Sequence, residues 1–236
     1  DIGNLIEHTL GYIYVQDPAS MIPPLVLDPK PGDDVLDMAA APGSKTTQLA
    51  QYMKNTGMII ANDSSSDRLK ALEINLRRLG IMNTTITLAQ GDHLKKLLKN
   101  GITFDKILLD APCSGSGTIR KSFKTLTSYS EHFIQTMSRT QKRLLNTAFE
   151  LVKTGGNIVY STCTLEPEEN EEVITSLLEK NPKASIESID LEINSSDPIL
   201  GWEGKSYSKE LKKALRIYPQ DNDTEGFFVC KIKKNA

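Results

Sequence analysis

Short apolar runs alternate with longer segments of helical periodicity along this chain. Each short run is typical of a buried strand, because its apolar residues are consecutive and turn residues bound it. Between these runs, apolar residues recur at helical spacing, as in the leucine series from Leu69 to Leu79 that stops at Gly80. The alternation predicts one α/β domain. We expect strands at about 35–36, 57–63, 84–88, 104–110, 157–161, 184–190 and 226–232, and helices at about 45–53, 66–79, 94–99, 130–152 and 167–180.

Two segments fall outside this alternation. Residues 1–33 predict an extended entry followed by a helix that packs beside the sheet, with Gln16 and Asp17 near the N-terminus of that helix. Residues 34–236 would then form the main, catalytic part of a single-domain protein. The stretch 118–130 is polar and has no clear period, so we expect a loop there.

The composition supports one large core and argues against several classes of protein. A chain of 236 residues with 39% hydrophobic content can bury such a core. No apolar run reaches the ~18–20 residues of a membrane span, and the start does not resemble a signal peptide. The three cysteines show no C-x-x-C or Cys/His pairing, which argues against a disulfide framework or a zinc site. We therefore expect a cytoplasmic protein with no metal and no membrane partner.

The charge of the chain does not by itself indicate a nucleic-acid partner, because the formal net charge is only −2. Local clusters of basic residues could still build a basic face, and the alternative is that each cluster is simply a solvated helix surface. The clusters are Arg139, Lys142 and Arg143, and Lys205, Lys209, Lys212, Lys213 and Arg216.

The first predicted strand runs into a turn of small residues that opens a helix, and this turn is suited to a nucleotide. Gly43 tolerates a positive φ, and the free N–H groups of the helix that begins near Lys45 face the carboxyl end of the strand. The turn is not a P-loop, because Ser44 follows Gly43 and Met38 stands where the first glycine should be. It also lacks the three glycines of a dinucleotide fingerprint. A nucleoside-type ligand without a dominant phosphate remains, and a purely structural turn is the alternative.

Acidic residues end the next two predicted strands. Asp63 could accept hydrogen bonds from both ribose hydroxyls of such a ligand, or it could cap the following helix. Asp92 could meet an adenine amino group, or it could cap a helix that begins before Leu94. Local sequence leaves both alternatives open.

Two of the three cysteines follow predicted strands at the same edge of the sheet. Cys113 comes shortly after Asp110 at the end of the fourth strand, and Cys163 follows the fifth strand. Open α/β sheets place ligands at the carboxyl ends of their strands, so this edge is a candidate for chemistry. Cys230 lies inside an apolar strand and is expected in the core.

Three signatures occur in order, Ala39-Ala40-Ala41-Pro42-Gly43-Ser44-Lys45-Thr46, Asp110-Ala111-Pro112-Cys113-Ser114-Gly115 and Ser161-Thr162-Cys163-Thr164. With them, the chain resembles the Nop/Sun family of RNA cytosine-C5 methyltransferases, and within it the archaeal tRNA-modifying members, from about Gln16 to Val229. The resemblance implies a class I S-adenosylmethionine-dependent methyltransferase fold, Rossmann-like, with a mostly parallel seven-stranded sheet and helices on both faces. The implied cofactor is S-adenosyl-L-methionine and the implied partner is RNA, with tRNA favoured over rRNA.

The resemblance also implies roles for individual residues. Asp63 would bind the ribose hydroxyls, Arg68 would brace that acid and Asp92 would face the adenine. Cys163 would be the nucleophile and Cys113 would assist product release. The methionine part and the ribose side of the cofactor would be held by Ala39, Ala40, Ala41, Pro42, Gly43, Ser44 and Lys45.

Cytosine chemistry explains why these residue types are suitable. A thiolate that adds to C6 makes C5 enamine-like, so that C5 can attack a methyl sulfonium. A helix that starts near Pro167 could favour the Cys163 thiolate. Asp110, which also belongs to the cofactor set, could bind cytosine N3 and its amino group, and Lys45 could position the base or the sulfonium side.

Three other hypotheses stay open on sequence grounds. Cytosine methylation in DNA would place the nucleophile on the proline–cysteine motif, at Cys113 instead of Cys163. An rRNA cytosine-C5 methyltransferase would share every motif, and an RNA-binding scaffold could keep the fold without catalysis. Two features also depart from the family pattern: Ser44 stands at a usual glycine, and residues 119–123 lack an expected proline.

Overall fold

The computed structural model describes residues 2–236, and its centre is one eight-stranded sheet. The strands are β1 (Asp34–Asp37), β2 (Met58–Asp63), β3 (Thr84–Leu88), β4 (Phe104–Asp110), β5 (Val152–Thr162), β6 (Ala184–Glu187), β9 (Leu215–Ile217) and β10 (Phe227–Lys234), and a separate hairpin is formed by β7 (Gly201–Trp202) and β8 (Lys205–Ser206). Seven strands follow the order β3-β2-β1-β4-β5-β10-β6, and β9 pairs with β10. The pairs among β1 to β5 are parallel, whereas β10 runs antiparallel to its neighbours. The predicted mostly parallel sheet is confirmed.

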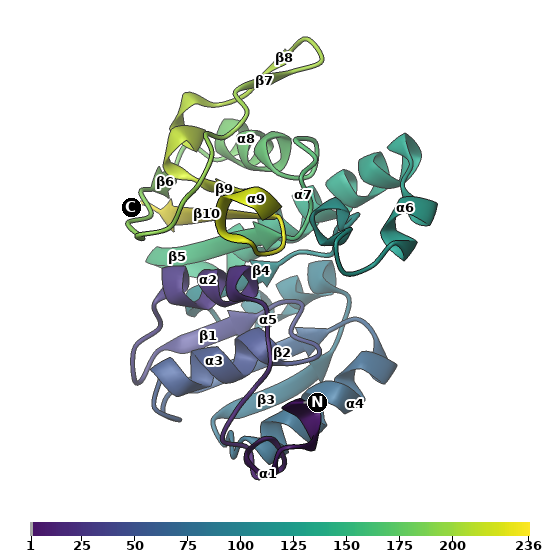
Figure 1. Ribbon diagram of the computed structural model, residues 1–236. Coiled ribbons are helices and arrows are strands. Elements are labelled where there is room, and N and C mark those ends of the chain that lie inside the picture. Colours follow the sequence, from purple (N-terminus) through teal and green to yellow (C-terminus); the bar gives the residue numbers. More distant parts are fainter. Residues whose placement is uncertain (1) are drawn as a thin grey trace.

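Helices connect the strands and cover both faces of the sheet (Figure 1). The α-helices are α1 (Ile6–Thr9), α2 (Pro18–Leu27), α3 (Ser44–Tyr52), α4 (Ser66–Arg78), α5 (Lys96–Lys99), α6 (Lys124–Ser128), α7 (Glu131–Leu151), α8 (Glu171–Lys180) and α9 (Pro219–Asn222). The 3-10 helices are η1 (Ile2–Asn4), η2 (Gly91–Lys95), η3 (Ser116–Thr118) and η4 (Lys209–Lys213). No helix among residues 2–236 combines the length and apolarity that a membrane crossing requires.

Side chains that alternate along the strands divide between the two faces of the sheet. Leu36 and Tyr160 point to the face that α7 and α8 cover, whereas Val35 and Val159 point to the face that α2 and α3 cover. All four side chains are buried. A period of two along a strand produces this division, and burial on both faces explains why the strands read as continuous apolar runs.

The start of α2 is set by its capping residue. Asp17 Oδ1 accepts a hydrogen bond from Ala19 N at 3.0 Å, and Pro18 occupies the first helical position. The predicted helix start near Gln16 and Asp17 is therefore confirmed. α2 packs against α3, β4, β5 and β10, beside the sheet. The division of the chain at residues 33 and 34 stays a prediction.

Several predicted boundaries are wrong, for local reasons. β5 begins at Val152 and runs through the glycines expected to precede it; Gly155 has a φ of +83°, and the pairing with β4 is irregular there. α8 begins at Glu171, because Asn170 has a non-helical backbone. The expected loop 118–130 contains the short helix α6, and the expected helix 94–99 is replaced by η2 and α5. β6 ends at Glu187, before residue 190.

A fully buried ion pair connects β9 to the start of α8. Arg216 Nη2 lies 2.6 Å from Glu171 Oε2, and both side chains have 0% exposure. Arg216 Nη1 also donates to Leu165 O at 2.8 Å, and Ile199 N donates to Glu171 Oε1 at 3.0 Å. Removal of one partner leaves the other charge buried without compensation, so the pair is sensitive to single substitutions.

A second buried charge lies at the end of β1. Asp37 is 1% exposed, and its Oδ2 accepts a hydrogen bond from Thr46 Oγ1 at 2.8 Å. Among residues 2–236, its Oδ1 has no hydrogen-bond partner. Burial, and to a lesser degree the nearby Asp110, raises the pKa of Asp37 to about 7. The folded protein therefore holds a proton here that the unfolded chain releases at lower pH.

We expect Glu171→Ala to lower the free energy of unfolding by about 3–5 kcal/mol, because the Arg216 guanidinium stays buried without its anion. Urea unfolding followed by circular dichroism measures the change. The control is Glu73→Ala, which removes an exposed pair with Arg77 on α4 and should change stability by no more than about 0.5 kcal/mol. Equal losses in the two variants would contradict the prediction, because the buried Glu171–Arg216 pair would then contribute no more to the free energy of unfolding than the exposed pair.

The shifted Asp37 pKa predicts a specific pH dependence. Because the folded pKa lies above the unfolded value of 3.8, the contribution of Asp37 to stability is complete below pH 3.8 and is lost as pH rises through 7. Relative to Asp37→Asn, the wild-type protein should lose about 4 kcal/mol of unfolding free energy across this window. Urea titrations of both proteins at several pH values test this, and parallel curves would contradict it.

Candidate active site

A cavity of about 330 Å³ opens at the carboxyl ends of β1, β2, β4 and β5. It lies where the strand order reverses between β1 and β4, which is the usual ligand position in an open α/β sheet. Its wall brings together residues that are far apart in the sequence. The predicted site residues that line it are Ala39, Asp63, Arg68, Asp92, Asp110, Cys113 and Cys163.

The rest of the predicted cofactor turn lies behind this wall. Ala40 and Ala41 are buried against Leu72 and Leu76 of α4. Gly43 has a φ of +109°, and a Cβ placed there would lie 2.9 Å from Leu72 Cδ1, so glycine is required at this position. The remaining predicted turn residues are not among those that line the cavity; these are Ala40, Ala41, Pro42, Gly43, Ser44 and Lys45.

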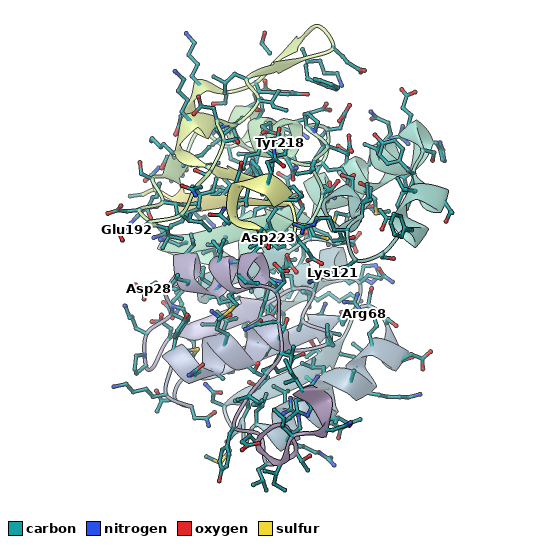
Figure 2. All side chains as sticks on the ribbon, viewed as in Figure 1. Asp28, Arg68, Lys121, Glu192, Tyr218 and Asp223 are labelled. Atoms are coloured by element: carbon teal, nitrogen blue, oxygen red, sulfur yellow. The ribbon has the colours of Figure 1, made fainter. Side chains whose placement is uncertain are left out.

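Asp63 is held in place at the end of β2. It is 2% exposed, and its carboxylate accepts hydrogen bonds from Ala41 N at 3.2 Å and from Ser65 N at 3.0 Å. Arg68, labelled in Figure 2, places Nη1 3.5 Å from Asp63 Oδ2 and also donates to Ala41 O. The N-cap of α4 is Ser65, so the alternative that Asp63 caps this helix is wrong.

Asp92 also lines the cavity, in the first turn of η2. The N-cap of η2 is Gln90, so the capping interpretation of Asp92 is wrong as well. Arg143 of α7 also lines the cavity, and its Nη1 lies 3.6 Å from Asp92 Oδ2. The sequence placed Arg143 only in a basic cluster and did not indicate this contact.

An ion pair lies next to the cysteines. Lys45 Nζ is 2.8 Å from Asp110 Oδ2 and donates to Ser20 Oγ at 2.8 Å, and Ser161 Oγ donates to Asp110 Oδ1 at 2.8 Å. The ammonium also lies 5.6 Å from the centre of the Phe227 ring. Burial alone would lower the pKa of Lys45, but the attraction and hydrogen bond of Asp110 outweigh it, and the pKa is raised. Lys45 therefore stays protonated.

The structure brings Cys113 and Cys163 together. Their sulfur atoms are 3.2 Å apart, and both side chains are half-buried. The hydrogen bond with Cys163, followed by burial, raises the pKa of Cys113 well above its usual value. Lys45 places a positive charge near Cys163, and the attraction between the two groups contributes to the raised pKa of Lys45.

Cys230 has no part in this pair. It is fully buried in β10 among the core residues, and burial raises the pKa of its thiol. The expectation that it is a core residue is confirmed.

The sequence did not indicate three residues that complete the site. Ser20 and Phe227 contact Lys45 from α2 and β10, and no local pattern relates these segments to the turn at residues 39–45. Ser161 belongs to a recognised signature, yet its hydrogen bond to Asp110 depends on the pairing of β4 with β5. Contacts of this kind become visible only when the strands are placed side by side.

Comparison with known proteins supports these observations. Residues 24–233 match the family model described as 16S rRNA methyltransferase RsmB/F. The tRNA (cytosine(49)-C(5))-methyltransferase of Pyrococcus abyssi is 51% identical, over 98% of this chain and 73% of its own length. The ribosomal RNA small subunit methyltransferase F of Shewanella amazonensis is 44% identical, over 99% of this chain and 48% of its own length. The chain thus spans about half the length of that rRNA relative.

A solved structure agrees with the fold and the ligand class. The crystal structure of NSun6 from Pyrococcus horikoshii with SFG superposes with a TM-score of 0.85 at 36% identity, over all of this chain and 56% of its own. SFG is an analogue of S-adenosylmethionine. The match spans the sheet, both helical layers and the segments that carry the two cysteines. The chain therefore belongs to the RsmB/F (Nop/Sun) family of S-adenosylmethionine-dependent RNA cytosine-C5 methyltransferases.

Proposed function

We propose that this chain methylates C5 of a cytosine in tRNA, through a covalent bond between Cys163 and C6 of the base. The observation that carries this proposal is the pair of cysteine sulfurs 3.2 Å apart, beside the Lys45–Asp110 ion pair. Support for tRNA comes from the relative of Pyrococcus abyssi, which is more similar than the rRNA relative and is covered over more of its length. We place this activity in the cytoplasm.

The residues around the cavity fit S-adenosylmethionine. A volume of about 330 Å³ lies within the range of small-molecule sites. Asp63 already accepts two backbone hydrogen bonds, but a carboxylate has about four acceptor positions, so its two oxygens can still accept the ribose hydroxyls. Asp92 would face the adenine amino group, and Ala39 leaves room for the chain of the ligand. When bound, the cofactor supplies an electrophilic methyl group on a sulfonium.

Cys163 would begin the reaction as a thiolate. Its Sγ bonds to C6, and the electron pair of the C5–C6 double bond moves to C5, which takes the methyl group. The negative charge that enters the ring is stabilised by the Lys45 ammonium. Asp110, fixed by Lys45 and Ser161, would accept a hydrogen bond from the amino group of the base. A base inside a duplex cannot reach this thiolate, so the target must be unpaired or flipped out.

Cys113 would act when the product leaves. The C5 proton passes to water, the C5–C6 double bond forms again, and the C6–S bond breaks with its electron pair on Cys163. The Cys113 thiol, 3.2 Å away, donates a hydrogen bond to the thiolate that forms. Because this hydrogen bond stabilises the free thiolate but not the adduct, its removal shifts the balance toward the adduct.

We expect the wild-type protein to transfer label from radioactive S-adenosylmethionine into 5-methylcytosine of tRNA. Cys163→Ala should remove this activity, because no other residue in the site forms the bond to C6. Cys113→Ala should instead leave a protein–RNA adduct that survives denaturation. Scintillation counting and denaturing gels measure the two outcomes on the same samples.

The substrate arm of this experiment uses 16S rRNA transcripts beside tRNA. Label in rRNA alone would contradict the tRNA assignment and favour the rRNA alternative. Retained activity in Cys163→Ala, with loss in Cys113→Ala, would exchange the roles of the two cysteines. Binding of the cofactor without label in any RNA would favour the scaffold alternative.

We expect Asp63→Ala to raise the Kd of S-adenosylmethionine at least about 10- to 100-fold, because even one hydrogen bond to a charged group contributes about 1.5–3 kcal/mol. Isothermal titration calorimetry measures the Kd. The matched control is Asp67→Ala, since the Asp67 side chain is 86% exposed and pairs with Lys70 on the surface of α4. A similar change in both variants would contradict ribose binding by Asp63.

A further inference from the structure

The backbone on both sides of Cys113 is held by two buried side chains. Gln141 of α7 donates from Nε2 to Pro112 O at 2.8 Å, on the N-terminal side of Cys113. Glu169 accepts a hydrogen bond at Oε2 from Ser114 N at 3.0 Å, on the C-terminal side. The two side chains also contact each other, because Gln141 Nε2 lies 2.7 Å from the same Oε2. They form a clamp, Gln141–Glu169, around one residue.

The clamp comes from two elements that pack beside each other, α7 and the turn before α8 (Figure 1). Both side chains have 0% exposure. The backbone oxygen of Glu169 also accepts a hydrogen bond from Tyr160 of β5 at 2.6 Å. The rigid elements α7 and β5 therefore hold the clamp in place, and the clamp in turn holds the Cys113 segment.

Stabilisation of the fold does not by itself explain why the carboxyl group of Glu169 is buried at this position. Within the described part of the chain, no ion pair links Glu169 to a Lys or Arg, and its Oε1 has no hydrogen-bond partner. Burial of an acid without a cation is costly, and burial accordingly raises the pKa of Glu169. An apolar side chain would avoid this cost, but it could not accept the hydrogen bond from Ser114 N. Buried, perturbed acids beside a reactive group are candidates for a functional role.

A second set of hydrogen bonds joins the Cys113 segment to the Cys163 segment. Ser114 Oγ and Thr164 Oγ1 are 2.8 Å apart, and Gly117 N donates to Cys163 O at 3.0 Å. The Cys113 segment is therefore held on two sides, by the clamp and by the Cys163 segment. Between these contacts the two sulfurs lie 3.2 Å apart.

We propose that Gln141 and Glu169 are positioning residues that hold the Cys113 thiol against Cys163 for product release. This inference rests on the proposed role of Cys113 in release. Neither residue lines the cavity, so both would act only through the Cys113 backbone. Loss of the clamp would leave bond formation at C6 and methyl transfer intact but would slow the departure of Cys163 from the adduct.

The test compares single-turnover methyl transfer with steady-state turnover on the RNA that the wild-type protein labels. Gln141→Met keeps the length of the side chain and removes both donated hydrogen bonds. We expect turnover to fall about tenfold, with first-turnover methylation changed less than about twofold, and a denaturation-resistant adduct to accumulate. Glu169→Ala should behave alike, and Glu169→Gln, which still offers an acceptor oxygen to Ser114 N, should recover most of the turnover.

The matched control is Ser138→Ala, one turn earlier on α7. Ser138 is 1% exposed and donates to Glu168 O at 2.6 Å, so it joins the same two elements without contacting the Cys113 segment. It should keep wild-type turnover and form no adduct. Titration of the cofactor and circular dichroism of each variant check folding, and the two independent clamp variants remain informative if one of them is unstable.

The outcomes separate this inference from the proposed function. If Cys113→Ala accumulates the adduct but Gln141→Met and Glu169→Ala do not, the clamp has no part in release and the inference is overturned. Equal loss of first-turnover methylation and steady-state turnover would also overturn it, because that pattern indicates a general structural effect. If Cys113→Ala itself forms no adduct, the proposed role of Cys113 fails, and the clamp inference fails with it.

Discussion

The Lys45–Asp110 ion pair is the interaction on which the site depends. Lys45 stands at the start of α3 and Asp110 at the end of β4, while Ser20 of α2 and Ser161 of β5 complete their hydrogen bonds. One buried contact thus fixes four elements relative to one another. It also leaves a lasting positive charge beside the sulfur of Cys163, because the pKa of Lys45 is raised despite burial.

Negative groups near the two cysteines affect the protonation of Asp37 and Cys113. Asp110 and Glu169 act on Cys113, Asp110 also acts on Asp37, and Lys45 pairs with Asp110. The hydrogen bond with Cys163, followed by burial and repulsion, raises the pKa of Cys113, and burial, followed by repulsion from Asp110, raises the pKa of Asp37. A neutral Cys113 is the state that a hydrogen-bond donor to Cys163 needs. Cys113 and Cys163 are chemically identical side chains, and their different surroundings give them different roles.

The strongest elements were predictable from the sequence alone because their signals are local. The runs Met58–Ala61 in β2 and Ile107–Leu109 in β4 are consecutive apolar residues with clear ends, and the leucine spacing of α4 produces one buried stripe. The weaker elements were not predicted, because their local signals are short or misleading. β9 and α6 are short, and the glycines at 155 and 156 lie at the irregularity inside β5, between the residues that pair with β4.

The sequence by itself determined which residues end each strand. It also showed that small residues and acids follow the first two strands. It also indicated the two reactive cysteines through their signatures. Only the tertiary structure decided that Ser20 and Phe227 complete the Lys45 site, that Ala40 and Ala41 face α4 instead of the cavity, and that Gln141 and Glu169 enclose Cys113. The physical reason is that these contacts join segments far apart in the chain, whose approach depends on sheet pairing and core packing and not on any local pattern.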